Sequence, residues 1–232
     1  MDIKVVVPAS GTGSRLGGKV PKQFLHIDSV PILKHTLDIF ENCPFVSEIA
    51  IAVPEGYISH VKGYGLSKVR HIVIGRDERA ESVYAALKCF SQVHNNPIVL
   101  IHDGIRMFIT GELIAAVAES AQKYGAAVAA APVTETIKQV DETGKILATP
   151  DRRGLWRAQT PQGFTYDIIM NAYSMAEAGG YLSLATDDSA LVEHLCLPVC
   201  IVPGNPENIK ITNSTDLIIA RALFDAREAG EI

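Results

Sequence analysis

Short apolar runs alternate with amphipathic segments along most of this 232-residue chain. The apolar runs predict strands at Ile3–Pro8, Glu48–Val53, His71–Ile74, Ile98–His102, Ala126–Ala131 and Leu197–Val202. The amphipathic segments predict helices at Ile32–Phe40, Tyr57–Tyr64, Ala80–Phe90, Leu113–Lys123 and Ser214–Ala229. Buried strands separated by helices are typical of a mostly parallel sheet covered on both faces. The pattern therefore predicts an α/β fold, a single Rossmann-like domain over residues 1–232, with ligands at the carboxyl ends of the strands.

The alternation of strands and helices ends after Ala131. Two β-prone runs, Thr136–Val140 and Lys145–Thr149, flank the turn sequence Asp141–Gly144 and predict a β-hairpin. A two-stranded hairpin is only marginally stable by itself in water, so it needs a surface to pack on. We therefore predict an inserted β-hairpin that serves as a dimerisation arm, over residues 133–153, and a homodimer.

A loop rich in small residues follows the first predicted strand, over Pro8–Gln23, and carries the cations Arg15 and Lys22. Small residues let backbone N–H groups approach phosphate oxygens, and the two cations supply charge for a polyanion. A Walker loop is one reading, but Val20 stands where that motif needs Ser or Thr. A dinucleotide-binding loop is another, but Leu16 stands where its third glycine belongs. An ordinary turn explains the glycines but not the paired cations.

Composition and charge narrow the function classes. The net charge of −5 and the pI of about 5.8 argue against nucleic acid as a partner. No apolar run is long enough to cross a membrane and the N-terminus shows no signal-peptide pattern, so we expect a cytoplasmic protein with no membrane partner. The four cysteines form no CxxC pair and the histidines no metal-binding pattern, which indicates reduced core thiols and no dedicated histidine metal site.

Several further motifs follow the loop in order along the chain. They are Asp77-Glu78-Arg79 with Ser82, His102-Asp103-Gly104-Ile105-Arg106, Thr136-Ile137-Lys138, Arg152 with Leu155-Trp156, Gln159-Thr160-Pro161-Gln162, Thr186-Asp187-Asp188 and Asn208-Ile209-Lys210-Ile211-Thr212. With the loop, they make the chain resemble the 2-C-methyl-D-erythritol 4-phosphate cytidylyltransferases over essentially its whole length. The resemblance implies transfer of CMP from CTP to that sugar-alcohol phosphate, giving 4-diphosphocytidyl-2-C-methyl-D-erythritol and pyrophosphate, in non-mevalonate isoprenoid precursor biosynthesis.

Three alternative functions stay open at this point. A non-catalytic nucleotide-binding module would keep the loop but would need neither Asp103 nor Lys210. A ribitol 5-phosphate cytidylyltransferase is similar, although the forms Leu155-Trp156 and Thr186-Asp187-Asp188 favour the methylerythritol enzyme. A nicotinamide-dependent oxidoreductase would also use a glycine-rich loop. It needs an acidic residue about twenty positions later, however, and Glu55 lies too far from Gly11.

Attack of one phosphate on another requires cations, because it brings two anions together. We expect Arg15, Lys22 and Lys210 to be catalytic, together with Mg²⁺ or another divalent cation as cofactor. Asp103 is the candidate metal ligand because it follows an apolar strand, at the edge where the ligands of such a sheet bind. The attacking phosphate is already ionised, so no general base is expected.

The resemblance implies a binding role for two further sets of residues. The nucleotide is implied to bind at Ala9, Ser10, Gly11, Gly75, Asp77 and Ser82. The sugar-alcohol phosphate is implied to bind at Asp103, Thr160 and Lys210 of one subunit and at Thr136 and Arg152 of the other. CTP and the sugar-alcohol phosphate are therefore the expected small-molecule partners.

Three positions depart from the pattern of this family. Ser10 stands where Ala is usual and adds a hydroxyl, and Arg76 stands where Gly is usual, so its backbone needs a negative φ. Met107 stands where a rigid proline is usual, and we expect it to loosen the loop after Asp103. We expect Trp156 to lie in the core rather than in the site.

Overall fold

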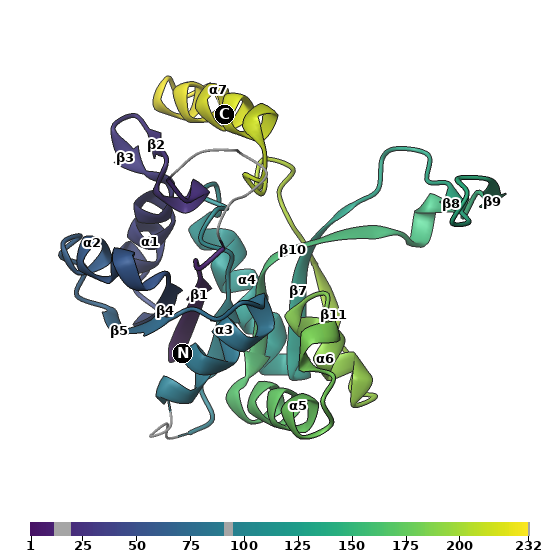
Figure 1. Cartoon of the computed structure of the whole chain (residues 1–232), viewed down its shortest axis with the longest axis horizontal. Coiled ribbons are helices and arrows are strands. Elements are labelled where there is room, and N and C mark those ends of the chain that lie inside the picture. The colour runs from purple at the N-terminus through teal and green to yellow at the C-terminus, as the bar shows by residue number, and fades with distance from the viewer. Residues whose placement is uncertain (12–19, 91–94, 232) are drawn as a thin grey trace.

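A seven-stranded sheet forms the centre of the computed structural model, which describes residues 1–11, 20–90 and 95–231 (Figure 1). Its strand order is β11-β7-β10-β6-β1-β4-β5. The strands are β1 (Ile3–Pro8), β4 (Val46–Val53), β5 (Val69–Ile74), β6 (Ile98–Ile101), β7 (Ala126–Pro132), β10 (Trp156–Thr165) and β11 (Cys200–Pro203). Every strand predicted from an apolar run is confirmed to within a few residues, and so is the α/β class with a mostly parallel sheet.

Helices cover both faces of this sheet. They are α1 (Ile32–Asn42), α2 (Ile58–Lys62), α3 (Arg79–Leu87), α4 (Gly111–Tyr124), α5 (Tyr166–Ala178) and α6 (Asp188–His194), whereas α7 (Ser214–Glu228) lies away from the sheet. Short 3-10 turns and a two-stranded ladder complete the body, as η2 (Lys22–Phe24), η3 (Glu55–Tyr57), η4 (Lys88–Phe90), η6 (Leu182–Leu184), β2 (His26–Ile27) and β3 (Val30–Pro31). The helix α4 is capped at both ends. At its N-terminus, Thr110 Oγ1 accepts a hydrogen bond of 3.3 Å from the N–H of Leu113, and at its C-terminus Gly125 has a φ of 91°.

Alternate residues of the central strands face two different cores, as the two-residue period of a strand requires. Val5 of β1 belongs to the core that α1 and α4 cover, whereas Val6 belongs to the core on the side of α3 and α5. A third apolar cluster joins α7 to β2 and to the segment Ile105–Phe108. Because the helices occupy both faces, the carboxyl edge of the parallel strands is left open for a ligand site.

The strand β10 lies between β6 and β7 and runs antiparallel to both. The apolar pattern does not predict it, because its buried side chains include Gln159, Thr160 and Gln162. Each of these polar side chains is hydrogen-bonded to another element of the fold. A central strand therefore carries polar groups to the edge where Asp103 follows β6.

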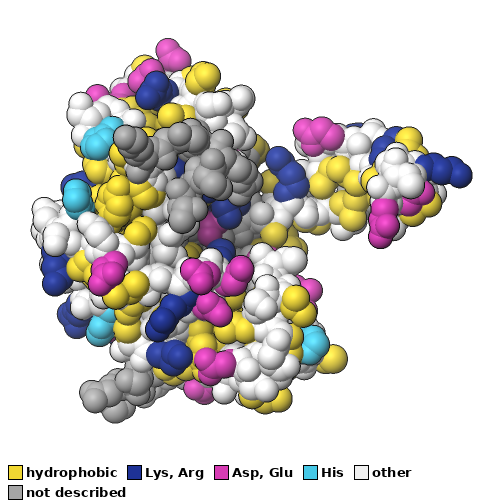
Figure 2. All heavy atoms as spheres, viewed as in Figure 1, with side chains coloured by type: hydrophobic (Ala, Val, Ile, Leu, Met, Phe, Trp, Pro, Cys, Tyr) yellow, Lys and Arg dark blue, Asp and Glu magenta, His cyan; other side chains and the backbone are white. Residues whose placement is uncertain are grey.

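The predicted β-hairpin is confirmed as an arm that projects from the body (Figure 1). β8 (Gln139–Val140) and β9 (Ile146–Ala148) form its tip and are shorter than predicted, and the turn η5 (Arg152–Gly154) leads back into β10. The arm exposes apolar side chains, among them Leu147 at 60%, and Figure 2 shows hydrophobic atoms over the arm. An arm without a core of its own and with exposed apolar groups is a candidate interaction surface.

One expectation about packing is wrong. Trp156 is 41% exposed rather than buried in the core; it begins β10 two residues after η5, where β10 pairs with Pro132 at the end of β7. Met107 is 4% exposed and packs in one apolar cluster with Ile105 and Phe108. The expected loosening of the loop after Asp103 stays a prediction.

No helix within the described ranges is long and apolar enough to cross a membrane. The four cysteines are free. Cys43 is buried, whereas Cys196 is exposed and therefore is not a core thiol.

Candidate active site

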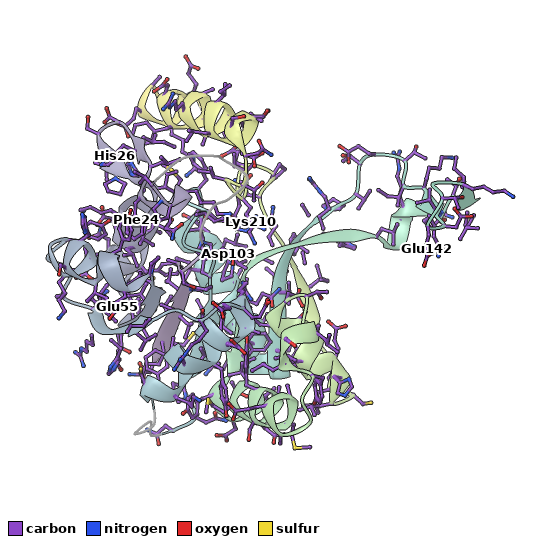
Figure 3. The ribbon with its side chains drawn as sticks, viewed as in Figure 1. Phe24, His26, Glu55, Asp103, Glu142 and Lys210 are labelled. Carbon is purple, nitrogen blue, oxygen red and sulfur yellow. The ribbon has the colours of Figure 1, made fainter. Side chains whose placement is uncertain are left out.

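Asp103 lies two residues after the end of β6, and three cationic side chains surround its carboxylate. Lys210 Nζ lies 2.8 Å from Asp103 Oδ2, Arg79 Nε lies 3.0 Å from Oδ1, and Arg106 Nε lies 3.6 Å from Oδ2. Figure 3 shows Asp103 and Lys210 side by side at the centre of the molecule. Burial by itself would raise the pKa of Asp103, but the three positive charges outweigh it and hold that pKa well below its ordinary range. Asp103 is therefore an ionised carboxylate at neutral pH.

Arg79 connects Asp103 to a second carboxylate. Its Nη1 and Nη2 donate to Oδ1 and Oδ2 of Asp188 at 3.0 and 2.8 Å. Asp188 is fully buried at the start of α6, and the hydroxyl of Tyr173 donates to it at 2.5 Å. Burial would lower the pKa of Arg79, but Asp188 and Asp103 outweigh it and raise that pKa well above its ordinary value. Sequence reasoning did not assign Arg79 or Asp188 to the site, although both stand in the family's motifs.

His102 holds the hydroxyl of Thr160 in one hydrogen-bonding orientation. His102 Nε2 lies 3.0 Å from the carbonyl oxygen of Arg106, which only accepts, so Nε2 carries the ring proton. Burial lowers the pKa of His102 to about 4, so the ring is neutral and its Nδ1 accepts from Thr160 Oγ1 at 3.0 Å. Thr160 Oγ1 in turn accepts from the N–H of Asp103 at 3.1 Å. The hydroxyl therefore keeps a lone pair, and no proton, for a ligand.

Asn208 joins the segment that carries Lys210 to the rest of the site. Its side chain is fully buried, and its Nδ2 donates to the carbonyl oxygen of Thr160 at 2.7 Å. Its own backbone carbonyl oxygen accepts from Arg106 Nη1 at 2.7 Å. These bonds fix the backbone two residues before Lys210, so the lysine reaches Asp103 from a defined position.

A first cavity opens beside β1 and contains most of the predicted nucleotide-binding residues. It is lined by Pro8, Ala9, Ser10, Gly11, Lys22, Gln23, Asp77, Arg79, Asp103, Ile105 and Lys210. Gln23 shapes its rim, because its Nε2 donates to the carbonyl oxygens of Ala9 and Gly11 at 2.6 and 3.1 Å. The structure therefore brings Ala9, Ser10, Gly11 and Asp77 together with the predicted catalytic residues Lys22 and Lys210.

The other two predicted nucleotide-binding residues, Gly75 and Ser82, contact Ser10 and are not among the described residues that line this cavity. Ser82 is fully buried, and its Oγ lies 3.0 Å from Ser10 Oγ and accepts from the N–H of Arg76 at 2.8 Å. A Cβ atom on Gly75 would lie 1.9 Å from the Cβ of Ser10, so this close approach requires glycine. Arg76 is accommodated because its φ is not positive. These residues position Ser10.

Asp103 also lines a second cavity. It is lined by Arg79, Asp103, Arg106, Ala158, Gln159, Thr160, Gln162, Thr186, Asp187 and Lys210. Three of the predicted substrate-binding residues, Asp103, Thr160 and Lys210, are therefore brought together here. Arg79, Asp103 and Lys210 line both cavities, so a group that passes from one cavity to the other meets these three side chains.

The remaining predicted residues are not brought to the cavities within the described part of one chain. Thr136 and Arg152 are exposed on the arm, which projects away from the body (Figure 1). Arg152 Nη1 donates to the carbonyl oxygen of Thr134, which also lies on the arm. Arg15 belongs to the segment 12–19 and lies outside the described residues.

Asp103 is the predicted residue that could help to hold a divalent cation, together with phosphate oxygens of a substrate. The described residues contain no group of three or more His, Cys, Asp or Glu side chains that could hold a metal by themselves. Mg²⁺ commonly binds through one or two carboxylates together with phosphate oxygens and water. Asp103 is ionised and faces both cavities. Its two oxygens already accept from Arg79 and Lys210, yet each oxygen keeps a further lone pair.

A Rossmann-like sheet with a cation-rich junction between two cavities defines an α/β enzyme suited to transferring a phosphate-bearing group. The family model described as "IspD: 2-C-methyl-D-erythritol 4-phosphate cytidylyltransferase" matches residues 3–226, and the chain belongs to this family. The curated protein of that name from Syntrophus aciditrophicus (strain SB) is 43% identical in an alignment over 235 residues, gaps included. The alignment covers 99% of this chain and 98% of the relative. The one from Symbiobacterium thermophilum is 41% identical over 224 residues, with 96% and 93% covered.

Solved structures of the family share this fold. The crystal structure of 2-C-methyl-D-erythritol 4-phosphate cytidylyltransferase from Thermus thermophilus matches with a TM-score of 0.80 and 32% identity, covering 97% of this chain and 100% of that one. The Francisella tularensis structure matches with a TM-score of 0.83 and 27% identity, covering 95% and 98%. The protein is therefore a cytidylyltransferase, and the resemblance stated from its motifs is confirmed. These comparisons do not favour the ribitol 5-phosphate or oxidoreductase alternatives.

Proposed function

We propose that this protein transfers CMP from CTP to 2-C-methyl-D-erythritol 4-phosphate, giving 4-diphosphocytidyl-2-C-methyl-D-erythritol and pyrophosphate for isoprenoid precursor biosynthesis. The observation that carries the proposal is the junction of two cavities at Arg79, Asp103 and Lys210. CTP occupies the cavity that contains Ser10, and the sugar-alcohol phosphate occupies the cavity that contains Thr160. The two phosphates then meet where cations offset their repulsion.

The reaction joins two phosphates. An oxygen of the acceptor phosphate attacks the α-phosphorus of CTP and forms a new P–O bond. The bond from the α-phosphorus to the oxygen that bridges to the β-phosphorus breaks, and pyrophosphate leaves with the electron pair. No general base is needed, because the attacking phosphate is already ionised. Lys22 and Lys210 supply positive charge along the cavity of the nucleotide, and we assign Arg15 the same role.

The site works with Mg²⁺ or another divalent cation, which Asp103 holds together with phosphate oxygens of the substrate. When bound, the cation neutralises part of the phosphate charge. The ionised state of Asp103 and its position facing both cavities support this assignment.

The protein acts as a homodimer in which the arm, residues 133–153, crosses to the neighbouring subunit. Thr136 and Arg152 of one subunit then bind the sugar-alcohol phosphate at the acceptor cavity of the other. The planar guanidinium of Arg152 suits this role because it can bind two phosphate oxygens at once. Support comes from the exposed apolar side chains of the arm, which are Ile137, Val140, Ile146 and Leu147.

The enzyme works in the cytoplasm, and its small-molecule partners are CTP and the sugar-alcohol phosphate. The free state of its four cysteines supports a reducing compartment. The net charge of −5 argues against a nucleic-acid partner.

The test is release of pyrophosphate from CTP by the purified protein with Mg²⁺. Separate reactions contain 2-C-methyl-D-erythritol 4-phosphate, ribitol 5-phosphate or no acceptor, and ATP, GTP and UTP replace CTP as matched controls. The proposal expects release with the methylerythritol acceptor and CTP, and mass spectrometry should show CMP joined to that acceptor. If pyrophosphate is released with ribitol 5-phosphate but not with the methylerythritol compound, the acceptor is ribitol 5-phosphate. If pyrophosphate is released with neither acceptor, the proposed function is overturned.

A further inference from the structure

We propose that Arg79 is a further catalytic residue, whose guanidinium binds the α-phosphoryl group while that group is transferred. Asp188 and Tyr173 act through Arg79 and are positioning residues, because Asp188 holds its guanidinium and Tyr173 holds Asp188, and neither touches the substrate. The inference rests on the proposed function, since the phosphoryl group is the one transferred in that reaction.

The position of Arg79 puts it beside the reacting phosphorus. Arg79 begins α3 and, among the described residues, shares the lining of both cavities only with Asp103 and Lys210. The α-phosphorus is bonded first to the pyrophosphate in the nucleotide cavity and then to the oxygen of the acceptor in the other. It must therefore lie where the two cavities meet. The side chain of Arg79 is 30% exposed, so part of it stays accessible from the cavities.

The hydrogen bonds of Arg79 leave donors for a ligand. A guanidinium carries five N–H groups in one plane. Within the described part of the chain, Nε donates to Asp103, and Nη1 and Nη2 each donate once to Asp188, which accounts for three. The second N–H of Nη2 lies next to the Nε N–H on the same edge of the group. That edge faces Asp103, so this N–H lies beside a carboxylate that lines both cavities.

Asp188 is held rigidly, and this fixes the plane of the guanidinium before substrate binds. Gln162 of β10 makes two hydrogen bonds to the start of α6. Its Nε2 donates to Asp187 Oδ2 at 2.8 Å, and its Oε1 accepts from the N–H of Ser189 at 2.9 Å. Asp188 lies between these two residues and is fully buried. A donor that is already oriented costs no reorganisation during the reaction, which is how such groups stabilise developing charge most effectively.

Arg79 could have a structural role alone, as a bridge between Asp103 and Asp188, or a catalytic role, as a donor to the transferred phosphoryl group. Substitution of Arg79 gives different results for these two roles. Loss of a structural bridge lowers thermal stability and, by releasing Asp103, raises the Mg²⁺ concentration that is required, but it leaves turnover unchanged when both substrates and Mg²⁺ are saturating. Loss of a donor to the transferred phosphoryl group lowers kcat, with little effect on the ground-state affinity for CTP. The readouts are therefore kcat, the two KM values, CTP affinity by calorimetry and the unfolding temperature.

The variants are Arg79→Lys, which keeps the charge but loses the planar fork, and Asp188→Asn, which keeps the shape of the anchor but removes its charge. Arg70→Lys, at an exposed position on β5, is the matched control and should leave kcat unchanged. We expect Arg79→Lys to lower kcat by about 100-fold to 1,000-fold, as for other oriented donors at a reacting centre. CTP affinity should stay within about threefold of the wild-type value. Asp188→Asn should lower kcat in the same direction by a smaller factor.

Chemical rescue separates catalysis from folding. Guanidinium ion at millimolar concentration should restore part of the kcat of Arg79→Ala, since Asp103 and Asp188 remain to bind it, and the added Asp188→Asn change should abolish that rescue. If wild-type protein makes the product while Arg79→Lys and Asp188→Asn retain its kcat, this inference is overturned and the proposed function stands. If Arg79→Ala is folded and slow but guanidinium restores nothing, Arg79 is not the donor. If wild-type protein makes no product, the proposed function fails and this inference falls with it.

Discussion

Lys210 Nζ and Asp103 Oδ2 lie 2.8 Å apart where the two cavities meet, although the residues come from distant parts of the chain. Asp103 follows β6, whereas Lys210 belongs to the segment before α7 that Asn208 ties to Thr160. The pair places an ionised carboxylate and a cation side by side, one suited to a metal and the other to a phosphate. The chemistry of the site therefore depends on a tertiary contact, and each of its charges can be tested separately.

Removing the charge of Lys22 or of Arg15 should lower turnover strongly and leave the fold intact. Loss of one oriented cation at a reacting phosphate costs about 3–4 kcal/mol, which corresponds to two to three decades in rate. Steady-state kinetics of Lys22→Ala and Arg15→Ala measure this, with circular dichroism and thermal unfolding as controls for folding. Near-normal turnover in a variant would remove that residue from catalysis.

Turnover should depend on a divalent cation, and Asp103→Asn should raise the concentration of Mg²⁺ that is required. A neutral amide is a poorer ligand for a hard cation than a carboxylate. Titration of activity with Mg²⁺ in wild-type and variant protein measures the shift, and calorimetry with Mg²⁺ and CTP checks it without turnover. Full activity in excess chelator would contradict both the cofactor and the role of Asp103.

The shared-site dimer predicts that Arg152→Ala weakens binding of the sugar-alcohol phosphate and leaves binding of CTP nearly unchanged. Mixing Arg152→Ala with Lys22→Ala subunits tests this further. In a mixed dimer one site carries both defects and the other carries neither, so a mixed dimer should recover up to about half of the wild-type activity. If subunits exchange and no activity returns, Arg152 serves its own subunit and the shared site is wrong.

The stability of the fold should decrease as the pH falls from about 6.5 to 4, because His102 is buried and neutral. Burial lowers the pKa of His102 from 6.5 to about 4 in the folded protein, so in this range the unfolded chain binds a proton that the folded chain does not. The contribution of neutral His102 to the free energy of unfolding is fully present above pH 6.5. About 3 kcal/mol of it is lost when the pH reaches about 4. Urea unfolding at several pH values in the presence of EDTA measures the slope.

The matched variant is His102→Gln, which keeps an amide that can donate to the carbonyl oxygen of Arg106 but does not titrate. Its stability should change less between pH 6.5 and 4.5 than that of the wild-type protein. An equal slope in both proteins would show that another group causes the pH dependence.

Local pattern accounts for most of the fold. Runs of apolar residues predict every strand of the sheet except β10, because a strand that is buried on both faces carries mostly apolar side chains. The hairpin is predicted by two β-prone runs on either side of a turn sequence. The same local signal fails for β10, whose buried side chains Gln159, Thr160 and Gln162 are polar and satisfied by distant partners. Trp156 is also misplaced, because its exposure depends on which elements pack against the start of β10 in the folded chain.

The sequence by itself determined the α/β class, the presence of the hairpin and, through the order of its motifs, the family. It also named the candidate site residues, whose roles stay predictions. Only the tertiary structure decided that Arg79 bridges Asp103 and Asp188, that His102 orients the hydroxyl of Thr160, and that Ser82 positions Ser10 instead of lining the cavity. The reason is physical. Strand and helix patterns arise between residues a few positions apart, whereas these contacts join elements that only the folded sheet brings within hydrogen-bonding distance.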